Sequence, residues 1–318
     1  MEVGGMTRIG VVFPGQGSQA LGMGVDVAKH STAARDLFDM AQSVLGYDLL
    51  GLQQHGPEER LRETQYSQPA IFVTNVAIFA ALELPPESLI VSAGHSFAEY
   101  CSLYAAQAIG FEDALRVVNA RGIAMQRAAE LAAGGMSAVL GMDAETIRAV
   151  VNQVRRQTGL RVQLANFNSP GQIVISGDLR GVQAAGDALL TAGAKRVVPL
   201  NVSGAWHSEL MEPALDQFSR VVEAAPFTLP QFDVVSNVDA HPYRDVETIK
   251  KNLVLSVTHE VLWHETALRL VSYGLDLIIE CGASPVLGPL MKRLPDAPEV
   301  VVVSDHAGAQ KLRSTVTA

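Results

Sequence analysis

The stretch Leu89-Ile-Val-Ser-Ala-Gly-His-Ser-Phe-Ala98 joins a short apolar run to a tight turn that carries a serine. The run from Leu89 to Ala93 has the length and composition of a buried strand, and residues 97–108 have the pattern of an amphipathic helix. A sharp turn between a strand and a helix exposes a serine hydroxyl at the edge of a sheet. We therefore predict that Ser96 is the nucleophile of a strand-turn-helix elbow; an ordinary turn with a helix-capping serine is the alternative.

Two other segments have the same order of elements. An apolar run from Arg8 to Phe13 ends in a Pro-Gly turn and is followed by a helical pattern over residues 25–45. A second run, over residues 275–280, leads through a turn at Gly282 into a helical stretch that ends near Arg293. Strands that alternate with helices form parallel sheets with helices on both faces. The larger part of the chain is therefore predicted to have an α/β fold.

Residues 134–201 have a different pattern. The expected order there is strand, helix, strand, strand, helix, strand, which is a split βαβ arrangement. Its four strands are expected at residues 137–141, 161–165, 173–176 and 196–200. We therefore predict a large domain of residues 1–133 and 202–318, with a small α+β domain of residues 134–201 inserted in it. The tail after Ala307 is expected to fray.

The composition excludes several classes of protein. A formal net charge of -9 at pH 7 argues against binding to nucleic acid, which requires a concentrated positive face. No apolar run approaches the roughly 18 residues that cross a bilayer, and the first residues lack the layout of a signal peptide. We therefore expect no membrane partner and a cytoplasmic location. The two cysteines, Cys101 and Cys281, are too few for a disulfide framework and are expected to be buried apolar residues.

Two short motifs suggest other chemistries. Gly15-x-Gly17-x-x-Ala20 follows a predicted strand, as a dinucleotide-binding turn does, but its third glycine is missing and it leaves the turn at Ser96 unexplained. His259, Glu260 and His264 resemble a zinc-protease motif with one residue too many. That extra residue turns the second histidine about 100° away from the first on a helix. We therefore predict no metal site.

Several separated segments resemble one family. They are the sequences FPGQGSQ at 13–19, GHSFAEY at 94–100, Arg121-Gly122 with Met125-Gln126, NFNSPGQIVISG at 166–177, VSGAWHS at 202–208, SNVD at 236–239, and the turn at Gly282. In this order they resemble the malonyl-CoA:acyl-carrier-protein transacylases and discrete polyketide acyltransferases. The resemblance implies an α/β-hydrolase-like large domain with an inserted ferredoxin-like small subdomain, in agreement with the order of elements above.

The resemblance also implies catalytic roles. Ser96 would be the acylated nucleophile, and His207 its general base and then the general acid for the departing thiol. The backbone N–H groups of Gln16 and Phe97 would form the oxyanion hole. The family usually orients this histidine through a backbone carbonyl instead of an acidic side chain, and the alignment puts that carbonyl at Leu262.

Two further residues are implied to bind the substrate. Arg121 would pair with the free carboxylate of the acyl group, because a guanidinium can hold a carboxylate through two hydrogen bonds. Trp206 stands where malonyl-using members usually carry phenylalanine and methylmalonyl-using members a serine. Its bulk favours an acyl group without a branch at C2, or a pocket of a different shape.

The predicted activity is the transfer of a malonyl group from coenzyme A to the phosphopantetheine thiol of an acyl carrier protein through a Ser96 ester, in fatty-acid or polyketide biosynthesis. Malonyl-CoA and the acyl carrier protein are the expected partners. Coenzyme A enters as the thioester substrate, and no bound cofactor is expected. The alternatives are transfer of a different acyl group, an editing hydrolase that releases acyl groups to water, and a silent module that only docks carrier proteins.

Overall fold

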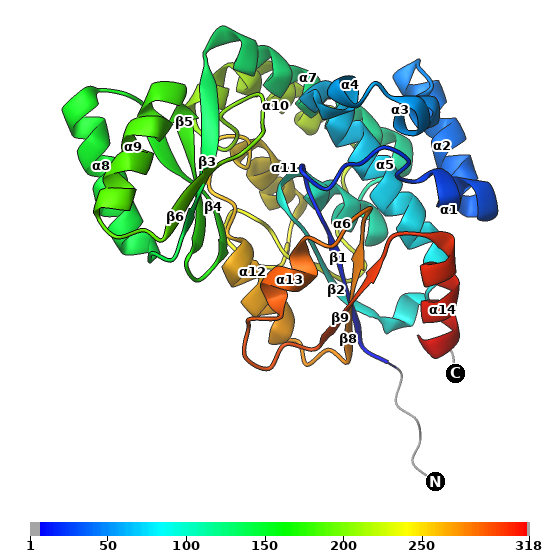
Figure 1. The fold of residues 1–318 in the computed structure, drawn as a ribbon. Coiled ribbons are helices and arrows are strands. Elements are labelled where there is room, and N and C mark those ends of the chain that lie inside the picture. Colours follow the sequence, from blue (N-terminus) through cyan, green and yellow to red (C-terminus); the bar gives the residue numbers. More distant parts are fainter. Residues whose placement is uncertain (1–6, 317–318) are drawn as a thin grey trace.

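The computed structural model describes residues 7–316. Figure 1 shows a larger part built from both ends of the chain and a smaller part built from its middle, each with its own sheet. Within residues 7–316 no helix is long and apolar enough to cross a membrane.

The larger sheet has five parallel strands in the order β7-β2-β1-β8-β9. These strands are β1 (Ile9–Phe13), β2 (Leu89–Gly94), β7 (Asp233–Val234), β8 (Leu277–Cys281) and β9 (Glu299–Val303). Successive residues of β1 face different cores: Val11 and Phe13 belong to one apolar cluster and Val12 to another. Both faces of the sheet are therefore buried, which confirms the predicted α/β class.

Most helices pack around this sheet (Figure 1). They are α1 (Val25–His30), α2 (Thr32–Leu45), α3 (Leu49–His55), α4 (Glu58–Arg62), α5 (Thr64–Leu82), α6 (Glu99–Ala105), α7 (Phe111–Leu131), α10 (Leu215–Ala224), α11 (Val246–Leu255), α12 (Trp263–Val271), α13 (Leu287–Met291) and α14 (His306–Val316), with 3-10 turns η1 (Pro86–Ser88), η2 (Ser96–Ala98) and η3 (Glu209–Ala214). The single helix expected over 25–45 is wrong. It breaks at Ser31, which is extended and accepts a hydrogen bond from the Ala34 amide as the N-cap of α2.

The smaller sheet is antiparallel, with the order β4-β5-β3-β6. It consists of β3 (Gly134–Leu140), β4 (Val162–Ser169), β5 (Gln172–Asp178) and β6 (Arg196–Pro199), and it packs against α8 (Ala144–Thr158) and α9 (Leu179–Thr191). The expected order of strands and helices is confirmed. Two hydrogen bonds tie β4 to the larger part: Phe167 donates to the Val261 carbonyl at 2.9 Å, and Val261 donates to the Ala165 carbonyl at 2.8 Å.

The chain is helical from His306 to Val316, so the fraying expected after Ala307 is wrong for residues 308–316, while residues 317 and 318 lie outside the described residues. Helix α14 begins beside Asp305, whose carboxylate accepts the Gly308 amide at 2.7 Å. Ala309 and Leu312 are buried in the same apolar cluster as much of α5. The helix therefore forms because its apolar side chains are covered, which the short terminal sequence alone does not reveal.

Removing the Leu312 side chain should destabilise the protein. Leu312→Ala should lower the free energy of unfolding by about 2–3 kcal/mol, because a buried leucine leaves a cavity when it is truncated. Leu190→Ala in α9 is the matched control, since Leu190 is 48% exposed and its loss should change stability by less than about 0.5 kcal/mol. Urea denaturation measures both. Equal small effects would mean that α14 does not dock as described.

Candidate active site

Ser96 is the first residue of η2, two residues after the end of β2, and has a backbone φ of 56°. The turn is tight: a Cβ atom on Gly94 would lie 2.0 Å from the carbonyl oxygen of Ala98, so only glycine fits there. The regular helix starts later than expected, because η2 occupies Ser96–Ala98 and α6 begins at Glu99. The elbow predicted from the sequence is thus present, with a 3-10 turn at its base.

His207 approaches this turn from the segment before η3. Its Nε2 lies 2.8 Å from Ser96 Oγ, and the ring is buried. On the other side, Nδ1 lies 2.7 Å from the Ser256 carbonyl oxygen and 3.1 Å from that of His259. Carbonyls only accept hydrogen bonds, so Nδ1 carries the proton and Nε2 is free to accept one from the serine.

The expected carbonyl at Leu262 is wrong. The Leu262 carbonyl accepts the Thr266 amide at 2.9 Å in the first turn of α12, so it belongs to the helix. The acceptors for His207 come from the turn after α11 instead, where Ser256 and His259 lie.

The environment of His207 favours the neutral imidazole. Burial lowers the pKa of His207 to about 3, and the positive charge of Arg121 acts in the same direction. The two carbonyls at Nδ1 partly oppose this by favouring the protonated ring. His207 is therefore a neutral hydrogen-bond acceptor at physiological pH, as a general base must be.

Gln16 reaches the site through a close approach of two backbones. A Cβ atom on Gly15 would lie 2.5 Å from the His95 carbonyl oxygen, so glycine is required where the turn after β1 meets the elbow after β2. Gln16 lines the pocket beside Ser96, and its side-chain Nε2 donates to Thr64 Oγ1 at 3.2 Å. Phe97, the other residue expected at the oxyanion hole, directly follows Ser96 and is buried.

These residues line a pocket of about 220 Å³ between the two sheets. One wall comes from the larger part and holds Gln16, Gln68, Arg121 and Met125. The opposite wall comes from β3, β4, β5 and the segment after β6, with Met136, Asn166, Asn168, Val174, Leu200 and Val202 among its residues. The sequence predictions of Ser96, His207, Gln16, Arg121 and Trp206 thus converge on one cavity.

Arg121 is a buried cation that lines this pocket. It is 1% exposed, and within residues 7–316 none of its guanidinium nitrogens has a hydrogen-bond partner. Burial lowers the pKa of Arg121 to about 10, which still leaves the group charged at neutral pH. Its neighbour Gly122 lets α7 approach α5 closely, because a Cβ atom there would lie 2.9 Å from the Thr64 carbonyl oxygen. A buried unpaired cation in a pocket is suited to bind an anion.

Trp206 packs where glycine makes room for it. A Cβ atom on Gly204 would lie 2.5 Å from Cη2 of the indole, so Gly204 is needed for this rotamer. The indole is buried, and in the described part of the chain its Nε1 has no hydrogen-bond partner. Trp206 therefore adds a bulky wall to the pocket.

Three polar residues at the site had no role predicted from the sequence. His95 Nε2 lies 2.9 Å from Asn168 Oδ1, which joins the elbow to β4. Asn237 contacts the Ser96 turn directly, with its Oδ1 accepting the Ser96 amide at 3.1 Å. The only signal for Asn237 was its place in the motif at 236–239.

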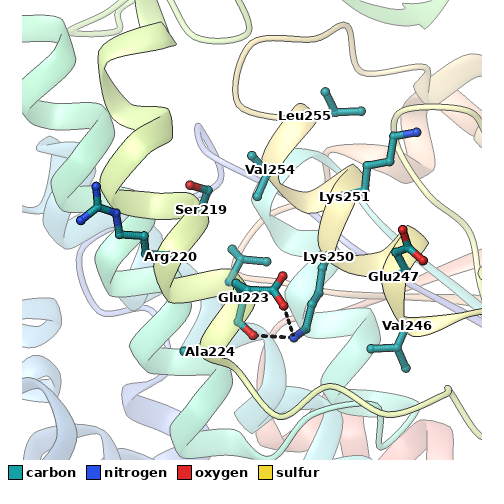
Figure 2. A pocket seen from close by; sticks show the side chains of 11 residues that line it. Ser219, Arg220, Glu223, Ala224, Val246, Glu247, Lys250, Lys251, Val254 and Leu255 are labelled. Atoms are coloured by element: carbon teal, nitrogen blue, oxygen red, sulfur yellow. Dashed lines mark hydrogen bonds and ion pairs between the residues drawn. The ribbon is translucent and has the colours of Figure 1, made fainter.

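A larger pocket, of about 970 Å³, lies between α10 and α11 (Figure 2). Its Lys250 is already used, because it donates to the Glu223 carbonyl at 2.5 Å and lies 3.6 Å from the Glu223 carboxylate. Its Ser219 hydroxyl donates to the Asp216 carbonyl. This surface groove offers no activated nucleophile, so the smaller pocket at Ser96 is the candidate active site.

Two residues of the motif formed by His259, Glu260 and His264 have other contacts. Glu260 pairs with Arg148 at 3.0 Å, and the His259 carbonyl binds His207. Among residues 7–316 no group of three or more histidine, cysteine, aspartate or glutamate side chains could hold a metal ion.

Comparisons with known proteins agree with this geometry. The acyl transferase domain family matches residues 11–302. Malonyl CoA-acyl carrier protein transacylases of Bacillus subtilis and Escherichia coli K12 are 39% and 38% identical, over 94% and 92% of this chain and 94% of each relative.

Solved structures are similar as well. A malonyl CoA-acyl carrier protein transacylase from Coxiella burnetii is 34% identical with a TM-score of 0.93, and the match covers 98% of this chain and 99% of that one. A malonyl-transacylase solved in complex with its type II polyketide acyl-carrier protein is 39% identical with a TM-score of 0.91, over 97% of this chain and 100% of that one. The chain therefore belongs to the malonyl CoA-acyl carrier protein transacylase family, within the acyl transferase domain family.

Proposed function

We propose that this protein transfers a malonyl group from coenzyme A to the phosphopantetheine thiol of an acyl carrier protein, through an ester on Ser96. One observation carries the proposal: the Ser96–His207 pair, at 2.8 Å, shares a pocket with the unpaired guanidinium of Arg121. A nucleophile and base permit acyl transfer in general, and a buried cation selects an acyl group with a free carboxylate. The names of the relatives agree with this substrate.

In the first half-reaction, Ser96 Oγ attacks the thioester carbonyl while His207 Nε2 takes its proton. The carbonyl oxygen becomes an oxyanion, which accepts hydrogen bonds from the N–H groups of Gln16 and Phe97. His207 then returns the proton to the sulfur as the carbon–sulfur bond breaks, and coenzyme A leaves. The carbonyls of Ser256 and His259 keep the imidazole in the required tautomer throughout.

In the second half-reaction the carrier-protein thiol is the nucleophile, as the serine hydroxyl was in the first. Its proton passes to His207, its sulfur attacks the ester carbonyl, and the proton returns to Ser96 Oγ as the ester bond breaks. Both halves use the same pocket in turn, so the kinetics are ping-pong. Coenzyme A thioester is a substrate here, and the proposed chemistry requires no bound cofactor.

The acyl carboxylate binds Arg121 in this proposal. The negative charge then offsets the guanidinium charge, which is one of the causes of the low pKa of His207. Substrate binding would therefore make His207 a stronger base at the moment when it must accept a proton. Trp206 closes the pocket beside C2 and limits the size of a branch there.

The proposal also covers the type of each domain, the carrier-protein partner and the cellular location. The order β6-β3-β5-β4, with a separate apolar core, supports a ferredoxin-like subdomain at residues 134–201. The parallel sheet with an elbow after β2 supports a hydrolase-like large domain at residues 1–133 and 202–318. The solved carrier-protein complex of a relative supports the carrier protein as partner. A cytoplasmic location stays a prediction.

Intact-protein mass spectrometry tests the acyl-enzyme. Mixed with malonyl-CoA, the wild-type protein should gain one malonyl group, Ser96→Ala should gain none, and His207→Ala should acylate about 10²–10⁴ times more slowly. Circular dichroism controls for folding. Malonyl on the Ser96→Ala protein would contradict the assignment. If water hydrolyses the wild-type ester and added carrier protein receives no malonyl group, the editing hydrolase is favoured.

The low pKa of His207 predicts an unusual pH profile. An ordinary histidine has a pKa near 6.5 and is largely protonated at about pH 5, whereas a pKa of about 3 leaves His207 neutral there. The value of kcat/KM for malonyl-CoA should therefore stay level from about pH 8 to about pH 5. Arg121→Ala should raise the pKa of His207 and move the acidic limb to higher pH. A wild-type loss of half the activity near pH 6.5 would contradict this expectation.

Arg121 and Trp206 should set acyl choice by charge and by shape. Arg121→Ala should weaken transfer of malonyl far more than transfer of acetyl, because only malonyl loses a charged partner. Trp206→Ser should raise kcat/KM for methylmalonyl-CoA by at most roughly 10–200-fold, because one methyl group in an apolar pocket changes kcat/KM by about that factor. The measurement is kcat/KM for malonyl-, methylmalonyl- and acetyl-CoA. Equal losses for malonyl and acetyl in Arg121→Ala would make the arginine structural.

A further inference from the structure

We propose that Asn237 is a positioning residue that holds the nucleophile turn and the loop behind His207 in one fixed arrangement, and that the buried carboxylate of Glu99 sets the position of Asn237. This inference rests on the proposed function, because it concerns the geometry of the Ser96–His207 pair.

The side chain of Asn237 spans the strained turn. Its Oδ1 accepts the Ser96 amide at 3.1 Å, and its Nδ2 donates to the Gly94 carbonyl at 2.9 Å. Ser96 has a φ of 56°, a conformation that a non-glycine residue keeps only when its surroundings hold it there. Nδ2 also donates to the Ser96 carbonyl at 3.4 Å, so Asn237 binds the turn on both sides of Ser96.

The main chain of Asn237 reaches the other half of the site. Its carbonyl accepts the Leu262 amide at 2.9 Å. Leu262 follows closely after His259, whose carbonyl is one of the two acceptors for His207 Nδ1. One residue therefore contacts both the turn that carries the nucleophile and the segment that orients the base, although Ser96 and His207 come from distant parts of the sequence.

Glu99 fixes Asn237 from behind. It is 2% exposed, and its carboxylate accepts the Asn237 amide at 2.9 Å, the Asn237 Nδ2 group and the Tyr243 hydroxyl. The neighbours of Nδ2, namely the Gly94 and Ser96 carbonyls and this carboxylate, are all acceptors, while the neighbour of Oδ1 is a donor. This pattern allows only one orientation of the side-chain amide. The elbow is thus supported by a fully buried polar cluster.

Asn237→Ala should lower kcat and leave KM nearly unchanged. The variant keeps Arg121 and the pocket walls, so malonyl-CoA binds, but the reacting atoms are held less well and acylation should slow by about 10–10²-fold. A small fluorophosphonate reacts with Ser96 without needing Arg121. The rate of this reaction should fall by a similar factor. Intact-protein mass spectrometry measures both rates on protein shown to be folded by circular dichroism.

Asn252→Ala is the matched control. Asn252 is buried in the same region and donates to Ser236 Oγ at 3.1 Å and to the Asp239 carboxylate at 3.0 Å, and neither of these bonds reaches the elbow. Its loss should reduce stability while kcat per folded molecule stays within about twofold of wild type. An equal fall in kcat for Asn252→Ala would overturn the proposal.

Asn237→Asp tests the same idea with an isosteric side chain, in case the alanine variant does not fold. The new carboxylate would lie against Glu99 and the Gly94 carbonyl, with Asp239 also acting on Glu99 as a negative charge and Arg121 as a positive one. Such crowding raises the pKa of one carboxylate. Activity relative to wild type should therefore rise as the pH falls from about 8 to about 5, because protonation restores a donor toward Glu99.

The outcomes separate this inference from the proposed function. Wild-type kcat and wild-type fluorophosphonate rates in Asn237→Ala, or an Asn237→Asp to wild-type ratio that does not change with pH, would overturn the positioning role. If the wild-type protein takes no malonyl from malonyl-CoA, yet Ser96 reacts with the fluorophosphonate and Asn237→Ala slows that reaction, the positioning role stands and the proposed substrate is wrong.

Discussion

The contact between Ser96 Oγ and His207 Nε2 is the interaction on which the rest of the site depends. Both residues have positive φ, at 56° and 58°, a conformation that costs about 1–3 kcal/mol for each residue. Neither residue would keep this backbone conformation in an isolated peptide. The close packing at Gly94 holds the serine, and the carbonyls of Ser256 and His259 hold the histidine, so the folded protein supplies what the local sequence resists.

The parallel sheet explains why the pieces meet. The carboxyl ends of parallel strands lie along one edge, where ligands bind in open α/β sheets. The turn after β1 brings Gln16, the turn after β2 brings Ser96, and the segment after β8 leads to Val286 and Leu290, all of which line the pocket. Glu280 secures that last segment, because its buried carboxylate accepts three successive amides at the start of α13.

The smaller sheet completes the cavity from the opposite side. Residues of β4 and β5 form one wall, and the hydrogen bond between His95 and Asn168 joins that wall to the elbow. The resulting pocket encloses an unpaired guanidinium next to a neutral imidazole. These two groups are coupled electrostatically, since the charge of Arg121 helps to keep His207 unprotonated. In the proposed mechanism, the charge of Arg121 that binds the acyl carboxylate therefore also lowers the pKa of the base, His207.

The local sequence was sufficient to predict much of the fold and the elbow at Ser96. Apolar runs with β-strand length and the turn residues around them predicted the parallel sheet, the inserted four-stranded unit and the elbow at Ser96. These features depend on neighbouring residues, so periodicity and turn chemistry reveal them. The motifs that carry the family resemblance selected His207, Gln16, Arg121 and Trp206, which the structure brings to one pocket.

Only the tertiary structure decided the features that depend on contacts between distant residues. Helix α14 forms because Leu312 is covered, and the orienting carbonyls belong to Ser256 and His259 and not to Leu262. A carbonyl carries no sequence signal, since every residue has one, and its direction depends on how successive turns close. The role of Asn237 is hidden for the same reason: an asparagine becomes a support only when folding places donors and acceptors on opposite sides of its amide.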